Sequence, residues 1–527
     1  MQKVLISEPL ADAGVEKLKV HFKVDVMTEL TPEQLIAAIP AYDALIVRSA
    51  TKVTREVIEA GANLKIVGRA GVGVDNVDVA AATEHGVVVV NAPTSNIVSA
   101  AEHTIALMLA QARNIPQANA SMKAGKWERG KFTGTEVYEK TLGIVGLGRI
   151  GGLVAERAKG LGMNVVGFDP YVGVERARTM GIDGAPDLKS LLKVADFITV
   201  HLPKTKGTIG LFGPKEFAAM KDGVRLVNTA RGGIYQNEAL VDALKSGKVA
   251  SAGIDVYEVE PCTDAPYFPF DNVIVTPHLG ASTEEAQDRA GIQIAEQVGA
   301  GLMGEFVSNA VNIAAVPREV MEQVRPYLEL ADGVGRMLAQ TVRGAVNEIE
   351  IAFIGGLAET DTRLLKTAVL RGMLDVVTPG KVNFVNAGLY AEQRGISVTE
   401  KKKPESVDYV NLIMVSAKTG GEPVSIGAAL IGKKNEPRLV SLNGFDLDMA
   451  PGQYMAFFRY EDVPGVIGKV GTVLGDAGIN IATMQVGRTT KGGQALMGVN
   501  VDSPLGPELL DDIVTTVGMA DAWSVEL

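Results

Sequence analysis

The sequence predicts an α/β protein with two doubly wound, Rossmann-like units, followed by an α+β unit and a small βαββαβ unit. Short β-branched runs alternate with helical segments over the first two-thirds of the chain, and a GxGxxG motif follows one of these runs. The chain also contains 59 glycines and only 5% aromatic residues. Glycine in such numbers, without a low-complexity tract, indicates many strand-to-helix turns. The 527 residues suffice for about three or four domains.

Composition excludes several classes of protein. Apolar residues make up 46% of the chain and charged residues 21%, which is unlike a disordered chain. The net charge of −11 argues against a protein built to bind nucleic acid or anionic lipid. The single cysteine, Cys262, excludes an intramolecular disulfide and fits a reducing cytosol. The N-terminal apolar run ends at Ser7, and no stretch approaches the roughly 20 apolar residues of a membrane span. We therefore expect a cytoplasmic protein with no membrane or nucleic-acid partner.

The first unit is expected to contain buried parallel strands separated by helices, because its apolar runs are short and rich in β-branched residues. The expected strands are 3–7, 44–48, 65–68 and 87–91, with helices at 31–39 and 55–60. An apolar helix at 100–111 connects this unit to the next. The pattern then restarts, with strands expected at 142–145, 164–168, 197–201, 225–228, 251–255 and 273–276, and helix through about residue 301.

The pattern changes after residues 311–317, which are expected to be a linker. Residues 348–354 alternate Glu with apolar residues and predict a half-exposed strand. Residues 401–404 are expected to be a basic turn, and 411–416 and 425–431 to be further strands. This α+β unit carries no catalytic motif. The last unit has strands expected at 454–459, 481–486, 494–501 and 523–527, with helices ending at 477 and spanning 508–517, a ferredoxin-like order.

The GxGxxG motif predicts a dinucleotide site. Gly146 allows a tight turn, Gly148 lets backbone amides approach a pyrophosphate, and Gly151 allows close packing of helix and strand. Asp169 ends the next strand and is expected to accept hydrogen bonds from the adenosine ribose. Because a carboxylate there repels a 2′-phosphate, NAD is favoured over NADP. The alternative is an α/β turn that merely requires glycine.

Three charged side chains follow the carboxyl ends of strands, where a doubly wound sheet binds ligands. Arg231 could grip the carboxylate and carbonyl of a 2-keto acid, and His278 could exchange the proton of its alcohol. Glu260 could hold His278 in one orientation. The alternative is that these are unrelated surface charges. His103, in an apolar helix, is expected to have a packing role, and His201 to form a wall near the cofactor rather than to be catalytic.

Residues 146–151 with Asp169, together with residues 228–233, 255–261 and 277–283, resemble motifs of the D-2-hydroxyacid dehydrogenase family. The resemblance covers about the first 310 residues. It implies NAD as cofactor, no metal, and Arg231, Glu260 and His278 as the catalytic trio. The implied NAD site comprises, beside the three glycines and Arg231, Val72, Arg149, Ile150, Asp169, Leu202, Thr229, Ala230, Asp255, His278, Leu279, Gly280 and Ala281. It also implies a discontinuous substrate domain (1–98 and 284–312) around an NAD-binding domain (99–283).

Within this family, residues 46–51 and 67–78 are most similar to enzymes that oxidise 3-phospho-D-glycerate to 3-phosphohydroxypyruvate, the first step of phosphorylated L-serine biosynthesis. Arg48 and Arg69 make physical sense as partners of a phosphate, beside Arg231. One of them could instead simply pair with an acidic neighbour. Arg129 and Lys131 are weaker candidates.

The C-terminal unit, 453–527, resembles an ACT domain through residues 462–467 and 478–481. The resemblance implies L-serine as an effector bound by Tyr460, Asp462 and Asn480. A dimerisation module without a ligand is the alternative. The 317–450 unit resembles the intervening domain of the long form of the family.

Three functions remain possible at this point. The first is the oxidation of 3-phosphoglycerate under feedback inhibition by serine. The second is a glyoxylate or hydroxypyruvate reductase, which needs the trio but not the phosphate-binding cations. The third is a redox-sensing binding protein of the C-terminal-binding-protein type. We also expect a homo-oligomer, with a symmetric dimer through the 100–140 region and a tetramer through paired ACT units.

Overall fold

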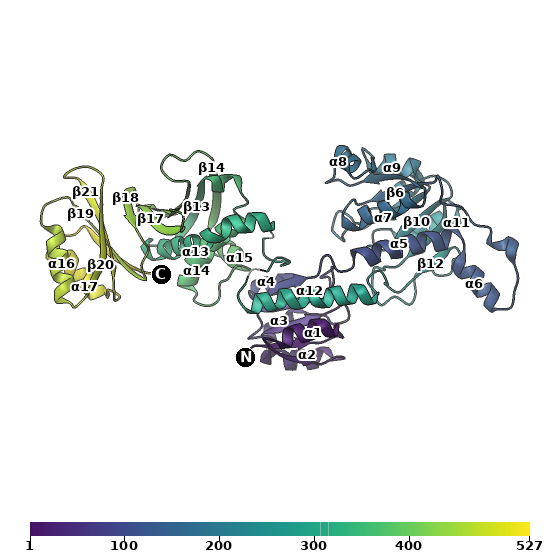
Figure 1. The fold of residues 1–527 in the computed structure, drawn as a ribbon, viewed down its shortest axis with the longest axis horizontal. Coiled ribbons are helices and arrows are strands. Elements are labelled where there is room, and N and C mark those ends of the chain that lie inside the picture. The colour runs from purple at the N-terminus through teal and green to yellow at the C-terminus, as the bar shows by residue number, and fades with distance from the viewer. Residues whose placement is uncertain (306, 315) are drawn as a thin grey trace.

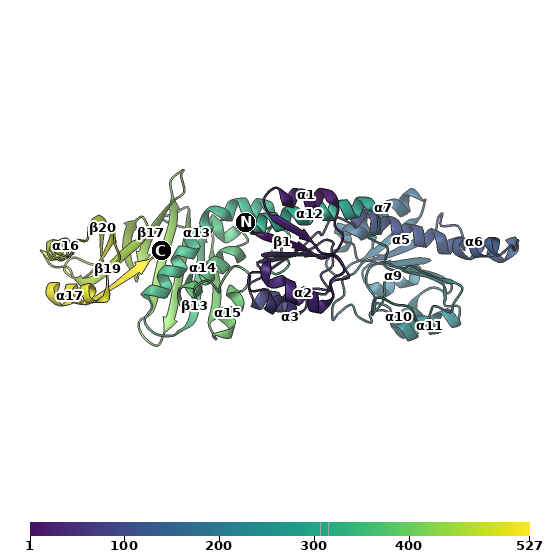
Figure 2. The ribbon, with the colours of Figure 1, turned by 90° about the horizontal axis from the view of Figure 1, so that it is seen from below.

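The computed structural model describes residues 1–305, 307–314 and 316–527. Its four sheets belong to four units that lie in a row, as Figures 1 and 2 show. The row does not follow the order of the chain. The N-terminal unit lies between the second unit and the two C-terminal units (Figure 2).

The first unit is built on a parallel five-stranded sheet of order β2-β1-β3-β4-β5. Its strands are β1 (Lys3–Ile6), β2 (Lys23–Val26), β3 (Ala44–Val47), β4 (Ile66–Arg69) and β5 (Val88–Asn91). Its helices are α1 (Asp12–Lys19), α2 (Pro32–Ala38), η1 (Ile39–Ala41), α3 (Arg55–Ala60) and α4 (Val79–Glu84). The long helix α12 (Glu284–Leu302) returns to pack against α1 and β4 (Figure 1). The four expected strands are confirmed, and β2 was not predicted.

The second unit has a parallel seven-stranded sheet of order β12-β11-β10-β9-β6-β7-β8. Its strands are β6 (Thr141–Val145), β7 (Asn164–Phe168), β8 (Asp183–Gly184), β9 (Phe197–Val200), β10 (Val224–Asn228), β11 (Val249–Ile254) and β12 (Val273–Val275). Around it lie α5 (Ile97–Ala112), α6 (Ile115–Lys123), η2 (Arg129–Phe132), α7 (Arg149–Gly160), α8 (Val174–Thr179), α9 (Leu188–Val194), α10 (Pro214–Ala219) and α11 (Asn237–Lys245). The strand order reverses beside β6, and ligands bind at such a reversal in doubly wound sheets.

The third unit has a six-stranded sheet of order β14-β13-β15-β16-β17-β18, in which only β13 and β14 are parallel neighbours. The strands are β13 (Val346–Gly355), β14 (Ser397–Lys403), β15 (Asn411–Thr419), β16 (Val424–Ile431), β17 (Glu436–Leu442) and β18 (Phe445–Met449). The helices are α13 (Arg318–Thr341), η3 (Gly356–Glu359), α14 (Arg363–Val377) and α15 (Ala387–Gln393). The basic turn expected at 401–404 is wrong. Lys401 lies in the edge strand β14, where its ammonium is 2.6 Å from the Glu350 carboxylate.

The connection to this third unit is attached to the edge of the first sheet. The Val311 N–H donates to the Val89 carbonyl at 2.7 Å, and the Asn312 side chain accepts from the Val89 N–H and donates to the Val87 carbonyl, both at 2.9 Å. The expected linker therefore has an ordered start. Its residue Ala315, like Phe306 in the preceding segment, lies outside the described residues.

The last unit has an antiparallel sheet of order β20-β21-β19-β22, which confirms the βαββαβ arrangement. Its elements are β19 (Tyr454–Glu461), α16 (Val466–Asp476), β20 (Ile481–Arg488), β21 (Gln494–Val501), α17 (Pro507–Val517) and β22 (Asp521–Glu526). Both helices cover one face of the sheet (Figure 1). In the whole described part of the chain, no helix is both long and apolar enough to cross a membrane.

Candidate active site

The glycine-rich turn between β6 and α7 has the geometry of a dinucleotide site. Gly146 has φ +101°, and a Cβ there would lie 2.5 Å from the His201 carbonyl oxygen. A Cβ on Gly151 would lie 2.1 Å from the Gly146 carbonyl oxygen. At Gly148, unlike at Gly146 and Gly151, an added Cβ would meet no atom within 4 Å. A 12-residue helix begins directly after Gly148. Space therefore remains in front of a helix N-terminus, where a pyrophosphate fits.

Asp169 follows β7 and faces the same turn. One of its carboxylate oxygens accepts the Leu147 N–H at 2.9 Å and the other accepts the Tyr171 N–H at 2.8 Å. Each oxygen keeps a further lone pair for a ribose hydroxyl. The residues present thus fit the adenosine end of NAD.

The structure brings His278 and Glu260 together. Nδ1 of His278 lies 2.6 Å from one Glu260 oxygen, and the Tyr257 N–H donates to the other at 3.0 Å. Burial alone would raise the pKa of Glu260, but these hydrogen bonds outweigh it and hold that pKa below its ordinary value. Glu260 is therefore ionised at neutral pH, and Nε2 of His278 is left to exchange a proton.

Two of the three predicted substrate cations lie across from this pair, in the first unit. Arg48 and Arg69 follow or end β3 and β4. Burial, followed by repulsion from Arg231, lowers the pKa of Arg69 to about 10. Its Nε is buried and has no hydrogen-bond partner among the described residues. A desolvated cation in this state favours an anionic ligand.

Arg231 is held differently. Its Nε lies 3.5 Å from the Asp75 carboxylate, and its Nη1 donates to the Ala230 carbonyl at 2.7 Å. Arg231 belongs to the second unit and Asp75 to the first, so this ion pair spans the two units. Arg231 still lies close enough to Arg69 to repel its positive charge. Asp75 therefore binds a guanidinium that we predicted would bind the substrate.

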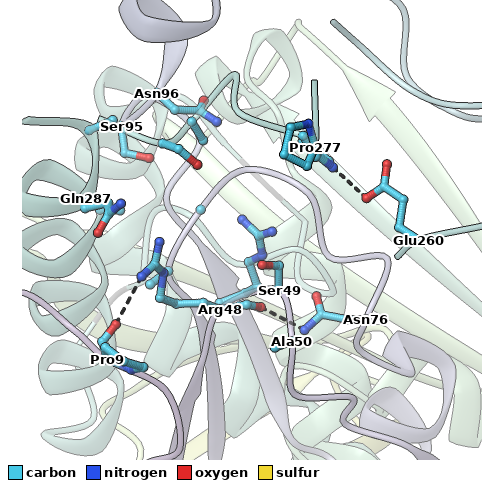
Figure 3. A pocket seen from close by; sticks show the side chains of 18 of the residues that line it. Pro9, Arg48, Ser49, Ala50, Asn76, Ser95, Asn96, Glu260, Pro277 and Gln287 are labelled. Atoms are coloured by element: carbon cyan, nitrogen blue, oxygen red, sulfur yellow. Dashed lines mark hydrogen bonds and ion pairs between the residues drawn. The ribbon is translucent and has the colours of Figure 1, made fainter. Parts of the chain in front are cut away.

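A cavity of about 1100 Å³ lies between the His278–Glu260 pair and the Arg48 and Arg69 cations, and Arg231 is not among the residues that line it. It is lined by Arg48 and Arg69 on one side and by Glu260 and His278 on the other, with Gln287 from α12 completing the wall. Figure 3 shows Glu260 on the side opposite Arg48 and Gln287. Both units therefore contribute to one site, as expected for a ligand that bridges them.

Several predicted residues lie outside this cavity or are buried. Arg129 and Lys131 lie in η2 and do not line it. The Thr229 hydroxyl is 2.6 Å from that of Thr104. Burial lowers the pKa of His201 to about 4, so its ring is neutral and suits the wall of the site that we predicted. The remaining predicted NAD contacts are Val72, Ile150, Leu202 and Ala230, which are half-buried, and Arg149, which is exposed.

Asp255 and His103 depart most from expectation. Asp255 is 0% exposed. Its carboxylate accepts hydrogen bonds from the Leu279 and Gly280 N–H groups at 2.7 and 2.9 Å, and lies 3.2 Å from His103. In this structure Asp255 therefore holds the 276–280 loop, and its contact with NAD stays a prediction. His103, assigned to packing, is part of a polar cluster.

Two of the three predicted effector residues are paired within the last unit, and the third is buried. Tyr460 is 4% exposed, and burial raises the pKa of its hydroxyl. Asp462 lies 3.2 Å from Arg488, and Asn480 donates to Asp502 at 2.7 Å. Among the contacts of the described residues, none joins Asp462 to Asn480. Their shared role stays a prediction.

Three residues that shape the cavity were not predicted from the sequence. Glu8 accepts the Arg48 and Thr51 N–H groups, each at 2.8 Å, and so orders the loop that carries Arg48. Asn76 donates to the Arg48 carbonyl at 2.8 Å. Gln287 is an ordinary polar position in the helical pattern of α12, and no sequence signal distinguishes it. Glu8 could have been found, because it follows β1 just as the predicted residues follow their strands. In the described ranges, no group of three or more His, Cys, Asp or Glu side chains is placed to hold a metal ion.

Comparisons with known proteins agree with this geometry. Residues 105–280 match the NAD-binding domain of the D-isomer specific 2-hydroxyacid dehydrogenases, residues 323–443 the D-3-phosphoglycerate dehydrogenase intervening domain, and residues 454–515 the ACT domain. The chain is 45% identical over 527 residues to the D-3-phosphoglycerate dehydrogenase of Methanocaldococcus jannaschii, and 41% identical to that of Bacillus subtilis. Each alignment covers 100% of both chains.

Solved structures resemble the first two units. One is the D-lactate dehydrogenase of Aquifex aeolicus with NAD and lactic acid, with a TM-score of 0.53 and 28% identity, over 59% of this chain and 99% of that one. The D-lactate dehydrogenase of Escherichia coli gives 0.53 and 29%, over 59% of this chain and 100% of its own. These structures lack counterparts to the C-terminal units, which the full-length relatives cover. The chain therefore belongs to the D-3-phosphoglycerate dehydrogenase family.

Proposed function

We propose that this protein oxidises the 2-hydroxyl of 3-phospho-D-glycerate with NAD, giving 3-phosphohydroxypyruvate and NADH, as the first step toward L-serine. One observation carries the proposal. A single cavity has the His278–Glu260 pair on one side and the Arg48 and Arg69 cations on the other. A substrate with an alcohol between two anionic groups fits this distribution of charge.

In this mechanism, His278 accepts the proton of the 2-hydroxyl at Nε2, because Nδ1 is engaged by Glu260. The Glu260 carboxylate stabilises the imidazolium that results, and its hydrogen bond fixes the ring. Arg231 holds the substrate carboxylate and polarises the C2 oxygen, after the substrate displaces Asp75 from the guanidinium. Arg48 and Arg69 bind the 3-phosphate. The glycine-rich turn and Asp169 would hold NAD, which would supply the acceptor for the hydride of C2.

The glycine turn supports the cofactor part of the proposal. Gly146, Gly148 and Gly151, with Arg149 and Ile150 at the start of α7, would hold the pyrophosphate, and Asp169 the ribose. The remaining residues proposed to contact NAD are Val72, Leu202, Thr229, Ala230, Arg231, Asp255, His278, Leu279, Gly280 and Ala281. This assignment makes 99–283 the NAD-binding domain and 1–98 with 284–312 the substrate domain.

The C-terminal units are proposed to regulate this activity, with 317–450 as the intervening domain and 453–527 as the ACT domain. L-Serine is the proposed effector, with Tyr460, Asp462 and Asn480 at its site. We also propose a homo-oligomer, a dimer or tetramer, and a cytoplasmic location in keeping with the single Cys262. The relatives that match along the full length weigh against the reductase and the redox-sensing binding protein.

The test is NADH formation by the purified full-length protein from NAD and 3-phosphoglycerate, with and without L-serine. We expect turnover with 3-phosphoglycerate, much less with unphosphorylated glycerate, and inhibition by serine. Turnover that is equal for the two substrates would remove the phosphate assignment. Turnover that does not respond to serine would remove the effector assignment and leave the reaction intact.

A further inference from the structure

A polar cluster lies behind His278, on three elements of the second unit. We call it the Asp255 cluster, and it consists of His103 on α5, Asp255 and Tyr257 after β11, and Thr276 after β12. The Thr276 hydroxyl donates to Asp255 at 2.6 Å. Nε2 of His103 lies 3.1 Å from that hydroxyl and 3.2 Å from the Asp255 carboxylate. Thr276 and Asp255 thus share one contact with His103.

The Asp255 cluster holds the chain on both sides of His278. Before His278, the carbonyl of Thr276 accepts the Tyr257 hydroxyl at 2.9 Å. After it, the Leu279 and Gly280 N–H groups donate to Asp255 at 2.7 and 2.9 Å. His278 between them has φ +55°, a left-handed conformation that a residue with a Cβ adopts only when its surroundings impose it.

The same cluster also reaches Glu260. The Tyr257 residue that binds Thr276 through its hydroxyl donates its backbone N–H to Glu260 at 3.0 Å. Both members of the His278–Glu260 pair are therefore attached to one hydrogen-bonded network. The network depends on Asp255, a carboxylate with 0% exposure whose partners must satisfy it fully.

We propose that His103 is a positioning residue for the reaction. It holds Asp255 and Thr276 in place, and through them it keeps His278 in the left-handed conformation that aims its ring at Glu260. His103 touches neither substrate nor His278 in this role. The inference rests on the proposed function, because it takes His278 as the group that accepts the substrate proton.

The test compares His103→Leu, His103→Gln and His85→Leu in the full-length protein. His85 is a control histidine, exposed at the end of α4. The readout is a single turnover with 3-phosphoglycerate and NAD, which separates the rate constant of NADH formation from its amplitude. We expect His103→Leu to lower the rate constant by roughly tenfold to a hundredfold, because a catalytic group displaced by about 1 Å loses that much. The amplitude and the KM for 3-phosphoglycerate should stay within about threefold of the wild type.

The conservative variant adds a rescue. The Gln amide can donate to Asp255 as His103 does, so His103→Gln should recover most of the rate constant that His103→Leu loses. Should His103→Leu fail to fold, Thr276→Val replaces it, since this near-isosteric change removes the hydroxyl shared by His103 and Asp255. The same fall in rate constant is expected.

Two outcomes would overturn the inference. One is a wild-type rate constant in His103→Leu or, where it is used, in Thr276→Val. The other is a loss confined to amplitude, which would mean that His103 only supports folding. A parallel His278→Ala variant separates the role of His103 from the mechanism itself. If His278→Ala keeps full turnover, the proposed mechanism fails, whereas a dead His278→Ala beside a fully active His103→Leu removes only this inference.

Discussion

The catalytic cavity and the predicted effector residues differ in how their polar groups are paired. In the cavity, Arg69 keeps a buried Nε without a partner among the described residues, and His278 keeps one ring nitrogen for the substrate. In the last unit, Asp462 is bound to Arg488 and to the Gly492 N–H, and Asn480 is bound to Asp502. The cavity thus has polar groups without partners within one chain, whereas two of the predicted effector residues already have partners inside the last unit.

From this difference we predict where ligand binding changes the structure. In the proposed mechanism the substrate displaces Asp75 from Arg231 and meets Arg69 and His278, whose free nitrogens are already in position. An amino acid bound at Asp462 would meet a carboxylate whose Oδ2 already accepts from an arginine and a backbone N–H. Preorganised sites lose less affinity to rearrangement.

The largest expected effect tests whether the cavity is catalytic. His278→Asn removes the proton acceptor but keeps a similar volume, so kcat should fall by about 10² to 10⁴. NAD affinity, measured by fluorescence titration or calorimetry, should change little. Glu260→Gln is a companion variant and should lose less, because His278 remains. A kcat near the wild-type value in His278→Asn would show that the cavity is not the catalytic site.

The next effect tests the unpartnered cation. Arg69→Ala should raise the KM for 3-phosphoglycerate by about a hundredfold, because a hydrogen bond to a charged group contributes about 1.5 to 3 kcal/mol. The measurement is steady-state NADH formation over a range of substrate concentrations. The control, Arg394→Ala, removes an exposed arginine of the third unit and should leave KM unchanged. An unaltered KM in Arg69→Ala would show that the anionic substrate binds elsewhere.

A smaller effect tests whether Asp462 belongs to the effector site. Asp462→Ala should weaken serine inhibition by about tenfold while turnover without serine stays at the wild-type value. Serine titrations of NADH formation provide the measurement. Asp476→Asn, at the exposed end of α16, is the matched control. An inhibition curve that Asp462→Ala does not move would place the effector site at other residues.

The smallest effect concerns acid stability. Hydrogen bonds hold the pKa of Asp255 below its ordinary value, although burial alone would raise it. Between the folded-state and the unfolded-state pKa of Asp255, the unfolded chain binds the proton and the folded protein does not. The contribution of this carboxylate to stability is therefore complete above pH about 4 and is lost as the pH falls through the folded-state pKa. Thermal unfolding of the wild type from pH 7 to 3 should show the loss. Asp255→Asn should be less stable at pH 7 by about 1 to 3 kcal/mol and less sensitive to acid. Equal slopes in the two proteins would contradict the assignment.

The sequence predicted most strands of both parallel sheets, because buried parallel strands are nearly continuous apolar runs. Edge strands were harder. β2 contains Lys23 and Asp25, and its polarity conceals it. Residues 401–403 were mistaken for a turn because three consecutive lysines do not resemble a strand. They pair with β13, and Lys401 neutralises Glu350 across the two strands. Long-range pairing overrode the local pattern.

The residues of the site also fall into those that could be predicted from the sequence and those that could not. Groups that follow strand ends, such as Glu260 and His278, could be brought together from topology alone. The pairing of Arg231 with Asp75 could not, because it depends on how the two units approach one another. His103 was assigned to packing because it lies in an apolar helix, and its contact with Asp255 depends on the placement of α5 against the sheet.

The segment that runs along β5 has a consequence for association between molecules. An exposed sheet edge offers unpaired N–H and C=O groups that can add a strand from another chain. Here the continuation of the same chain pairs with β5, and the Asn312 amide occupies the N–H of Val89 and the carbonyl of Val87. The opposite edge, β2, is four residues long and carries Lys23 and Asp25. A short, charged strand is a poor template, so the first sheet is protected against edge-to-edge aggregation at both ends.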